Sequence, residues 1–403
     1  MSALRTMKRR IATAIATTAA VAAVAGSVSA LPAAAAPAEG TVLNAGAADA
    51  VPGSYLVTLR SGAGFKATAS QGRSLISRYG GTVKRTYTSA LNGYATALTG
   101  AEARRLAADP AVASVEQDQV VRALGTQANA PWGLDRIDQA ALPLSGTYTY
   151  PDSGGGGSTV YVLDTGVRIT HQQIAGRASY GYDFVDNDAT AQDGYGHGTH
   201  VATTVAGTTY GVAKKAKIVA VRVLGNDGSG TTAGVVAGVD WITAHHIANS
   251  VANVSLGGGV SATLDSAVDK SIASGVTYSI AAGNSGALAS NSSPARVANA
   301  ITVGATTRTD ARAGYSNYGP RVDVFAPGSG ITAGWNTSDT ATYTGDGTSF
   351  AAPHVSGVAA LYLTAHPGAS PATVAAAVVN GATNGVLSGI GAGSPNKLLR
   401  LVP

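Results

Sequence analysis

A serine at the start of an apolar helical segment stands among residues that would suit a nucleophile. Ser349 follows Gly347 and precedes the apolar run 358–363. A serine in this position is ordinarily a helix cap, because its hydroxyl accepts a hydrogen bond from a free backbone N–H. Against a simple cap stands Pro353, beside the small Ala351 and Ala352, since proline is favoured only in a helix's first turn. The N–H groups and dipole there stabilise an oxygen that gains negative charge, which makes Ser349 a candidate nucleophile.

Two upstream segments supply a base and a carboxylate. The buried-strand pattern 159–163 ends in Asp164, and His197 lies among glycines before a second apolar helical segment. A serine hydroxyl needs a base that takes its proton, and an imidazole titrates near neutral pH. His200 lies on the same helix face as His197, so a metal pair is the alternative. A zinc site would need a third protein ligand, and the chain has no H-E-x-x-H pattern.

The order Asp164, His197, Ser349, with these neighbours, resembles the subtilase family of serine proteases, and within it the proteinase K-like group. Subtilisin has the same Asp, His, Ser order along its chain. The resemblance extends over about residues 51–403. It implies an endopeptidase in which Ser349 attacks, His197 is the base and Asp164 orients the imidazole. It gives His200 a packing role, and we interpret His354, His245 and His246 as structural or surface residues.

The resemblance also implies residues that surround the reacting carbonyl. Gly283-Asn284 alone is a turn signal, but the matching asparagine of subtilases donates its side-chain amide to the oxyanion, beside the serine N–H. Substrate would bind as an added strand. The pocket walls carry no charge, so we expect an apolar or aromatic residue before the scissile bond. The substrate-binding residues implied are Gly228, Ser229, Gly230, Ser255, Leu256, Gly257, Ala281, Ala282 and Gly283.

Structural calcium ions are the cofactor that the resemblance implies, with no catalytic cofactor. Calcium prefers carboxylate and carbonyl oxygens. One family site matches Asp323 with the carbonyls of Ala298 and Ala300. Part of a second site matches three more residues, although Ser145 and Thr147 stand where some relatives have stronger ligands: Asp135, Asp138 and Gln139. The acidic loop with Asp183, Asp186, Asp188 and Asp193 is either a third site or solvated charge.

Charge and composition limit the classes of partner. The 403 residues carry a formal charge of +5, but residues 125–403 contain 14 Lys and Arg against 16 Asp and Glu. The basic excess therefore lies in residues 1–124, and residues 125–403 have no basic patch interleaved with aromatics that would indicate nucleic-acid binding. The chain has no cysteine, and a large core can replace disulfides in a secreted protein. We expect a monomer whose partners are protein and peptide substrates and its own prodomain.

Three parts follow one another along the chain. Residues 1–36 have the pattern of a secretory signal peptide, with a basic start, the apolar run 11–28 and small residues after it. A membrane anchor is the alternative, but alanine contributes little transfer energy and the small residues favour cleavage. We therefore expect a secreted, extracellular protein with no membrane partner after cleavage. Residues 37–124 form a linker and an inhibitor prodomain, with its core at about 51–122, and residues 125–403 form the peptidase domain.

The prodomain is predicted to be a small α+β unit of the ferredoxin-like kind. Its strands at 54–59, 82–87, 93–98 and 112–116 and helices at 66–78 and 101–108 follow the order β-α-β-β-α-β. Its position resembles that of the inhibitor prodomain of subtilases, which assists folding and blocks the site, and an ordinary binding module is the alternative. Residues 130–138 resemble the start of mature proteinase K-like enzymes. We place self-processing of this zymogen near Leu124.

The larger part is predicted to have an α/β fold, a subtilisin-like parallel sheet flanked by helices. Nearly continuous apolar strands alternate with helices, as expected when helices cover both faces of a parallel sheet. The strands are predicted at 159–164, 217–223, 250–256, 277–282 and 300–305. The helices are predicted at 197–207, 232–246, 262–274, 348–365 and 371–380.

Two alternatives to a protease use the same motif. One is a catalytically inactive subtilase fold that only binds. The presence of all four implied catalytic residues argues against it. The other is a serine esterase, which would need Gly-x-Ser-x-Gly at a strand–helix elbow, and Ala351 occupies the place of the final glycine.

Sulfur is confined to the predicted signal peptide, in Met1 and Met7. Many relatives have methionine directly after the catalytic serine, where this chain has Phe350. We therefore predict that the mature enzyme resists mild peroxide, whose usual targets are thiols and thioethers.

Overall fold

The computed structural model describes residues 37–47, 50–120 and 124–402. The chain divides into two compact units between Asp118 and Gln119, and each unit is described by itself. The predicted signal peptide, residues 1–36, lies outside the described residues. In the described part of the chain, no helix is both long and apolar enough to cross a membrane.

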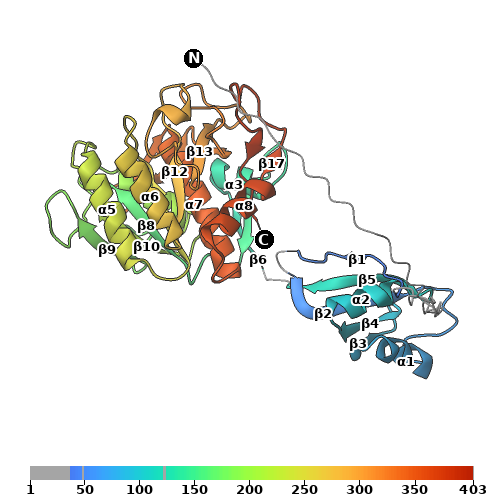
Figure 1. Cartoon of the computed structure of the whole chain (residues 1–403). Helices are drawn as coiled ribbons and strands as arrows, with labels where there is room; N and C mark the ends of the chain where they lie inside the picture. The colour runs from blue at the N-terminus through green and yellow to red at the C-terminus, as the bar shows by residue number, and fades with distance from the viewer. Residues whose placement is uncertain (1–36, 48–49, 121–123, 403) are drawn as a thin grey trace, which may run out of the picture. The chain divides into compact units, whose positions relative to one another are not determined.

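The N-terminal unit is an α+β sandwich of a sheet and two helices (Figure 1). Its elements are β1 (Val42–Leu43), β2 (Ala50–Leu59), α1 (Ser70–Arg78), β3 (Thr82–Tyr87), β4 (Gly93–Ala97), α2 (Gly100–Ala107) and β5 (Val112–Gln119). The sheet order is β1-β5-β2-β4-β3, with β4 antiparallel to β2 and β3. Helix α2 begins with a capping box between Thr99 and Glu102. The predicted β-α-β-β-α-β order is confirmed, with β1 added at the edge.

The larger unit contains a nine-stranded sheet in the order β17-β18-β14-β13-β12-β11-β8-β10-β9. The pairs from β18 to β9 are parallel, and β17 pairs antiparallel with β18. The strands are β8 (Thr159–Asp164), β9 (Ala178–Asp183), β10 (Lys217–Arg222), β11 (Ser250–Val254), β12 (Thr277–Ala281), β13 (Ile301–Thr306), β14 (Val324–Pro327), β17 (Thr383–Asn384) and β18 (Lys397–Leu398). The predicted fold class, a parallel sheet flanked by helices, is confirmed.

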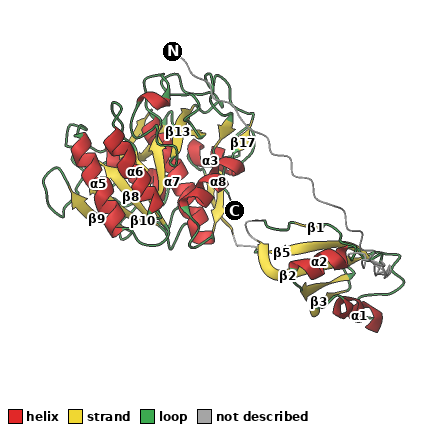
Figure 2. Cartoon of the chain, in the orientation of Figure 1, coloured by secondary structure: helices red, strands yellow, loops and turns green. Residues whose placement is uncertain are grey.

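Side-chain alternation along the strands gives the sheet two buried faces. On β8, Val160 and Val162 belong to one core, whereas Tyr161 and Leu163 belong to the other. The first core includes α4 (His197–Ala206), α7 (Thr348–Ala365) and α8 (Pro371–Gly381). The second includes α5 (Thr232–His245) and α6 (Ala262–Ala273). The helices therefore cover both faces (Figure 2), which explains why these strands read as nearly continuous apolar runs.

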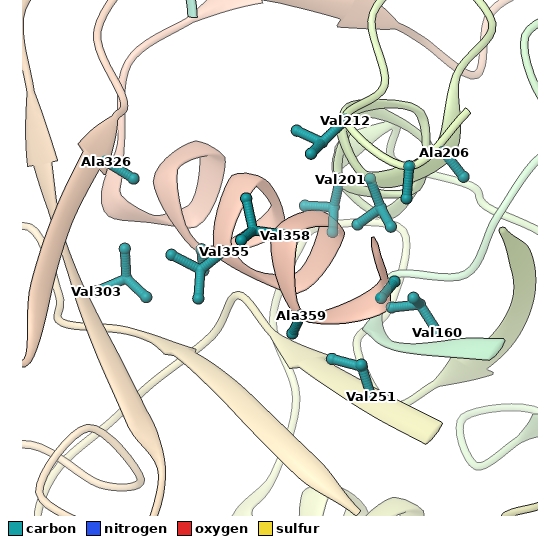
Figure 3. Packing of buried hydrophobic residues seen from close by; sticks show 14 of the residues in the cluster. Val160, Val201, Ala206, Val212, Val251, Val303, Ala326, Val355, Val358 and Ala359 are labelled. Carbon is teal, nitrogen blue, oxygen red and sulfur yellow. The ribbon is translucent and has the colours of Figure 1, made fainter. Parts of the chain in front are cut away.

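Helix α7 lies inside the first core and is buried from Phe350 to Leu363. Figure 3 shows its residues Val355, Val358 and Ala359 among side chains from neighbouring elements: Val160, Val201, Val212, Val251, Val303 and Ala326. Such a helix is apolar on all sides because every side meets protein. The core thereby holds the first turn of α7, with Ser349, against the sheet.

Several short elements were not predicted. They are β6 (Leu124–Ala128), α3 (Trp132–Asp138), β7 (Thr147–Pro151), β9, a 3₁₀ turn (Ala289–Asn291), β14, β15 (Ile331–Gly334), β16 (Thr342–Gly345), β17 and β18. Most contain too few residues for a periodic pattern, and long-range pairing creates them. The ten predicted strands and helices of the larger unit are confirmed, with ends within two residues. Leu124, the predicted maturation position, begins β6, which pairs antiparallel with β7.

Candidate active site

The candidate functional residues lie at the carboxyl edge of the parallel sheet. Asp164 is the last residue of β8, and Ser255 follows β11. Asn284 follows β12, while His197 and Ser349 lie in the first turns of α4 and α7. Sites of open α/β sheets form at this edge, because loops that leave neighbouring strands meet there.

Asp164 and His197 form a hydrogen-bonded pair, with His197 Nδ1 2.7 Å from Asp164 Oδ1. Asp164 is completely buried, and its Oδ1 also accepts a hydrogen bond from the Thr165 N–H at 2.8 Å. Burial by itself lowers the pKa of His197, but the charge and hydrogen bond of Asp164, helped by Asp193, outweigh it and raise that pKa. Because Nδ1 is held by Asp164, Nε2 is the nitrogen available for proton transfer.

Asp193 organises the turn that leads into α4. Its Oδ1 accepts hydrogen bonds from Thr165 Oγ1 at 2.9 Å and the Gly196 N–H at 2.7 Å. Its Oδ2 accepts from the Thr199 N–H at 2.9 Å and hydroxyl at 2.6 Å. From the sequence, Asp193 was interpreted only as part of an acidic loop. Its position four residues before His197, in a glycine-rich turn, was the signal that pointed to this role.

Ser349 is the second residue of α7, and its hydroxyl donates a hydrogen bond to the Ser255 carbonyl at 3.0 Å. Ser255 Oγ donates to the Ser349 carbonyl at 2.8 Å, so the two residues are linked reciprocally. The ring of Phe350, the residue after Ser349, lies 5.5 Å from that of His197 between centroids.

The amide of Asn284 has a defined orientation. Its Oδ1 accepts hydrogen bonds from both the N–H and the hydroxyl of Thr348, each at 2.8 Å. A backbone N–H can only donate, so the amide oxygen faces Thr348 and the NH₂ group points elsewhere. A Cβ atom built on Gly347 would lie 3.6 Å from Asn284 Nδ2. The NH₂ group therefore lies beside the backbone that begins α7.

Two adjacent hollows flank these residues. One, of about 490 Å³, is lined by His197 and the apolar side chains of Leu224, Val235 and Leu264. The other, of about 360 Å³, is lined by Asn284 and Ser349. All nine residues predicted to bind substrate line one or both: Gly228, Ser229, Gly230, Ser255, Leu256, Gly257, Ala281, Ala282 and Gly283. Among the described residues, neither lining includes Asp, Glu, Lys or Arg.

The remaining histidines have packing environments. His200 is buried, its Nε2 lies 3.1 Å from the Ile331 carbonyl, and burial lowers its pKa to about 3. His354 is buried against the Phe350 carbonyl, and burial lowers its pKa to about 4. His245 stacks on Trp241. In the described ranges, no three His, Cys, Asp or Glu side chains are grouped so that they could hold a metal ion.

The residues of the first predicted calcium site share one hollow of about 610 Å³, which Ala298, Ala300 and Asp323 all line. Asp323 Oδ2 accepts a hydrogen bond from the Thr302 N–H at 2.8 Å. Burial raises the pKa of Asp323 to about 6, against the opposing effect of that hydrogen bond and of nearby cationic side chains. A buried carboxylate that resists ionisation in this way is stabilised by a bound cation.

The residues of the second predicted calcium site surround the turn before β7. Asp135 accepts hydrogen bonds from the Ser145 N–H at 3.0 Å and the Gly146 N–H at 2.7 Å, while the Gln139 amide nitrogen donates to the Pro143 carbonyl at 2.8 Å. Burial raises the pKa of Asp138, whose Oδ1 has no partner among the described residues. Asp138 Oδ2 and Gln139 Oε1 also accept backbone N–H groups, so the protein itself uses most of these oxygens.

The acidic loop near the edge of the sheet neutralises a buried cation. Asp183 and Asp186 each lie 2.5 Å from Nη1 of Arg222, whose side chain is only 6% exposed. Asp188 Oδ1 accepts a hydrogen bond from the Thr190 N–H at 2.7 Å. These contacts, with those of Asp193, give each of the four loop carboxylates a partner within the protein.

Comparison with known proteins identifies relatives of both units. Residues 155–393 match the model of the Subtilase family, and residues 54–124 match that of the Peptidase inhibitor I9 family. The chain is 47% identical over 386 residues to an extracellular serine proteinase of Thermus sp. (strain Rt41A), covering 91% of this chain and 94% of the relative. It is 50% identical over 323 residues to alkaline serine exoprotease A of Vibrio alginolyticus, covering 79% of this chain and 60% of the relative.

A solved structure is also similar. The crystal structure of a cold adapted subtilisin-like serine proteinase matches with a TM-score of 0.67 and 52% sequence identity. The match covers 68% of this chain and all of the solved chain.

Proposed function

Because the chain belongs to the subtilase family, we propose that it is a secreted zymogen whose mature enzyme cleaves peptide bonds that follow apolar or aromatic residues. Its class is that of the serine-type endopeptidases, and its N-terminal unit is an I9 inhibitor prodomain. The observation that carries the proposal is the 2.7 Å hydrogen bond between His197 and Asp164, in one site with Ser349 and Asn284.

The proposed reaction follows from the atoms of this site. Ser349 Oγ attacks the carbonyl carbon of the scissile bond while His197 Nε2 removes the hydroxyl proton, and Asp164 stabilises the resulting imidazolium. Asn284 Nδ2 and the Ser349 N–H bind the oxyanion. His197 then gives its proton to the leaving amine, which leaves an acyl-enzyme. Water, deprotonated by His197, releases the acid and restores Ser349.

The preference for apolar or aromatic residues rests on the hollow beside Ser349. Its lining includes Ala282, Gly283, Leu288 and Ala295 and no charged side chain among the described residues. A charged substrate side chain would lose hydration there without gaining a counter-charge. The aliphatic floor of the adjoining hollow, with Leu224, Val235 and Leu264, supports a further apolar substrate residue upstream.

Structural calcium is part of the proposal. Asp323 with the carbonyls of Ala298 and Ala300 would hold one ion, since oxygen donors suit a hard cation and burial disfavours the bare carboxylate. Asp135, Asp138 and Gln139 fit a second ion less well, because the turn's own N–H groups occupy Asp135. Bound calcium would stabilise the fold and take no part in the reaction.

Secretion and maturation complete the proposal. The basic and apolar start of the chain supports export, and the Thermus relative is named an extracellular proteinase. We place cleavage near Leu124, performed by the enzyme's own catalytic residues. The released N-terminal unit would remain an inhibitor until it is degraded.

Expression of the full chain beside Ser349→Ala tests this function. We expect wild type to secrete a processed enzyme that cleaves a peptide anilide with Phe before the scissile bond. For the same anilide with Glu there, we expect kcat/KM at least about tenfold lower. Ser349→Ala should be inactive and retain its prodomain, as judged by intact mass. Efficient maturation of Ser349→Ala in a protease-free host would refute self-processing, and ester hydrolysis without peptide hydrolysis would refute the endopeptidase.

A further inference from the structure

The loop that carries Asn284 is bound along its length by a segment from a later part of the chain. Residues 315–318 run beside residues 283–287 and pair with them through the backbone. The Gly286 N–H donates to the Tyr315 carbonyl at 2.8 Å, and the Tyr318 N–H donates to the Ala287 carbonyl at 3.0 Å. A third bond runs from the Asn317 N–H to the Gly283 carbonyl at 2.8 Å. The loop is therefore docked on a second segment.

The side chain of Asn317 bridges the loop on both sides of Asn284. Its Oδ1 accepts hydrogen bonds from the N–H groups of Ser285 at 3.1 Å and Ala287 at 3.0 Å. Its Nδ2 donates to the Ala282 carbonyl at 2.8 Å. Asn317 is only 3% exposed. Its bond to the Ala282 carbonyl is buried and those to Ser285 and Ala287 are partly buried, so removing its amide takes a partner from all three backbone groups.

The close fit at Gly283 shows that the amide also sets the path of the backbone. Gly283 has φ +100°, a conformation that favours glycine. A Cβ atom at this position would lie 2.4 Å from Asn317 Nδ2. The residue directly before Asn284 therefore packs against the Asn317 amide itself.

We propose that Asn317 is a positioning residue for the oxyanion donor, an inference that rests on the function proposed for Asn284. Thr348 sets which way the Asn284 amide faces, and Asn317 sets where its backbone stands. An oxyanion donor acts only if it already points at the developing charge. A displacement of about 1 Å in an active site can cost about a hundredfold in rate, so the contribution of Asn317 belongs in kcat.

The chemistry of the bridge explains why asparagine is required. The position needs an acceptor for two N–H groups and a donor for one carbonyl in a planar group. Asn317→Asp keeps the acceptor but sets a carboxylate oxygen against the Ala282 carbonyl. Asn317→Ala removes donor and acceptor together.

A double-mutant cycle with Asn284 tests the proposal. We expect Asn284→Ala to lower kcat about 10²–10³-fold, the loss seen when an oxyanion donor is removed. We expect Asn317→Ala and Asn317→Asp each to lower kcat by about tenfold or more, with KM changed by less than about threefold. In the Asn284→Ala background, the same changes at Asn317 should alter kcat by less than about threefold, because the donor they position is gone.

A matched control separates positioning from general destabilisation. Asn396 also bridges backbone groups, accepting from the Leu387 N–H at 2.9 Å and donating to the Leu387 carbonyl at 2.8 Å, outside both active-site hollows. We expect Asn396→Ala to lower the thermal unfolding temperature and leave kcat unchanged. If Asn317→Ala fails to mature, Asn317→Asp completes the cycle.

The outcomes distinguish this inference from the function on which it rests. An unchanged kcat in Asn284→Ala would refute the oxyanion role of Asn284 itself. A large loss in Asn284→Ala, combined with equal losses from Asn317 changes in both backgrounds, would refute positioning alone. A loss from Asn317→Asp that appears only in KM would also overturn it.

Discussion

The buried ion pair between Arg136 and Asp310 offers a quantitative test of what holds the larger unit together. The Arg136 side chain on α3 is 1% exposed, with Nε 2.7 Å from Oδ1 and Nη2 3.0 Å from Oδ2 of Asp310. Asp310 has φ +57°, which asparagine also adopts readily. Asp310→Asn therefore keeps the size and backbone of the residue, removes its charge and replaces one of the two oxygens that accept from Arg136 by an NH₂ group.

The expected loss follows from the burial of the guanidinium. Removing one partner of a buried ion pair costs about 3–5 kcal/mol, because the remaining charge stays buried without compensation. A mature region of about 280 residues has an unfolding entropy of about 0.6 kcal/mol per kelvin. Asp310→Asn should therefore lower Tm by about 5–8 °C.

The assay is calorimetry of mature protein inactivated by a serine-directed inhibitor, so that autolysis does not interfere. The control is Asp339→Asn, which breaks the exposed pair of Arg168 and Asp339, with the Asp339 side chain 50% exposed. We expect that change to lower Tm far less, because solvent screens exposed charges. Combining Arg136→Met with Asp310→Asn should recover stability, since no charge is then buried. Equal Tm shifts in the two single variants would refute the reasoning.

Three further predictions concern the cofactor, oxidation and pH. Chelation should lower the temperature of inactivation, since calcium binds the native state, and Asp323→Ala should remove much of that sensitivity; an unchanged half-life in chelator would contradict the site. Peroxide doses that inactivate a relative with methionine after its catalytic serine should spare this enzyme, and Phe350→Met should restore sensitivity. Residual hydrolysis of a peptide anilide after timed exposure measures both effects. Rapid loss of activity in both wild type and Phe350→Met would place the damage elsewhere. The acid limb of kcat/KM should lie above the ordinary histidine pKa, because the raised pKa of His197 keeps it protonated to higher pH. Asp193→Asn should move that limb to lower pH. A limb that stays in place would exclude Asp193 as a cause of the raised pKa.

Local residue patterns predicted most of the fold, because the order of apolar and polar residues in a segment reflects which of its faces are buried. The segments that became β8, β11 and β12 are buried at every position, since both faces of the sheet are covered. The short strands β14 and β18 were not predicted, because so few residues give no period. The family resemblance is confirmed, while the roles of individual site residues remain proposals.

By itself, the sequence determined the kind of chemistry. Asp164, His197 and Ser349 stand in local motifs, and each motif names the residue type that the reaction needs. The tertiary structure alone decided how those groups are held. Asn317 bridges a loop about 30 residues away, and Arg136 meets Asp310 at a separation of 174 residues. A hydrogen bond depends on positions in space, and no local pattern records a partner that the chain reaches only after it has folded.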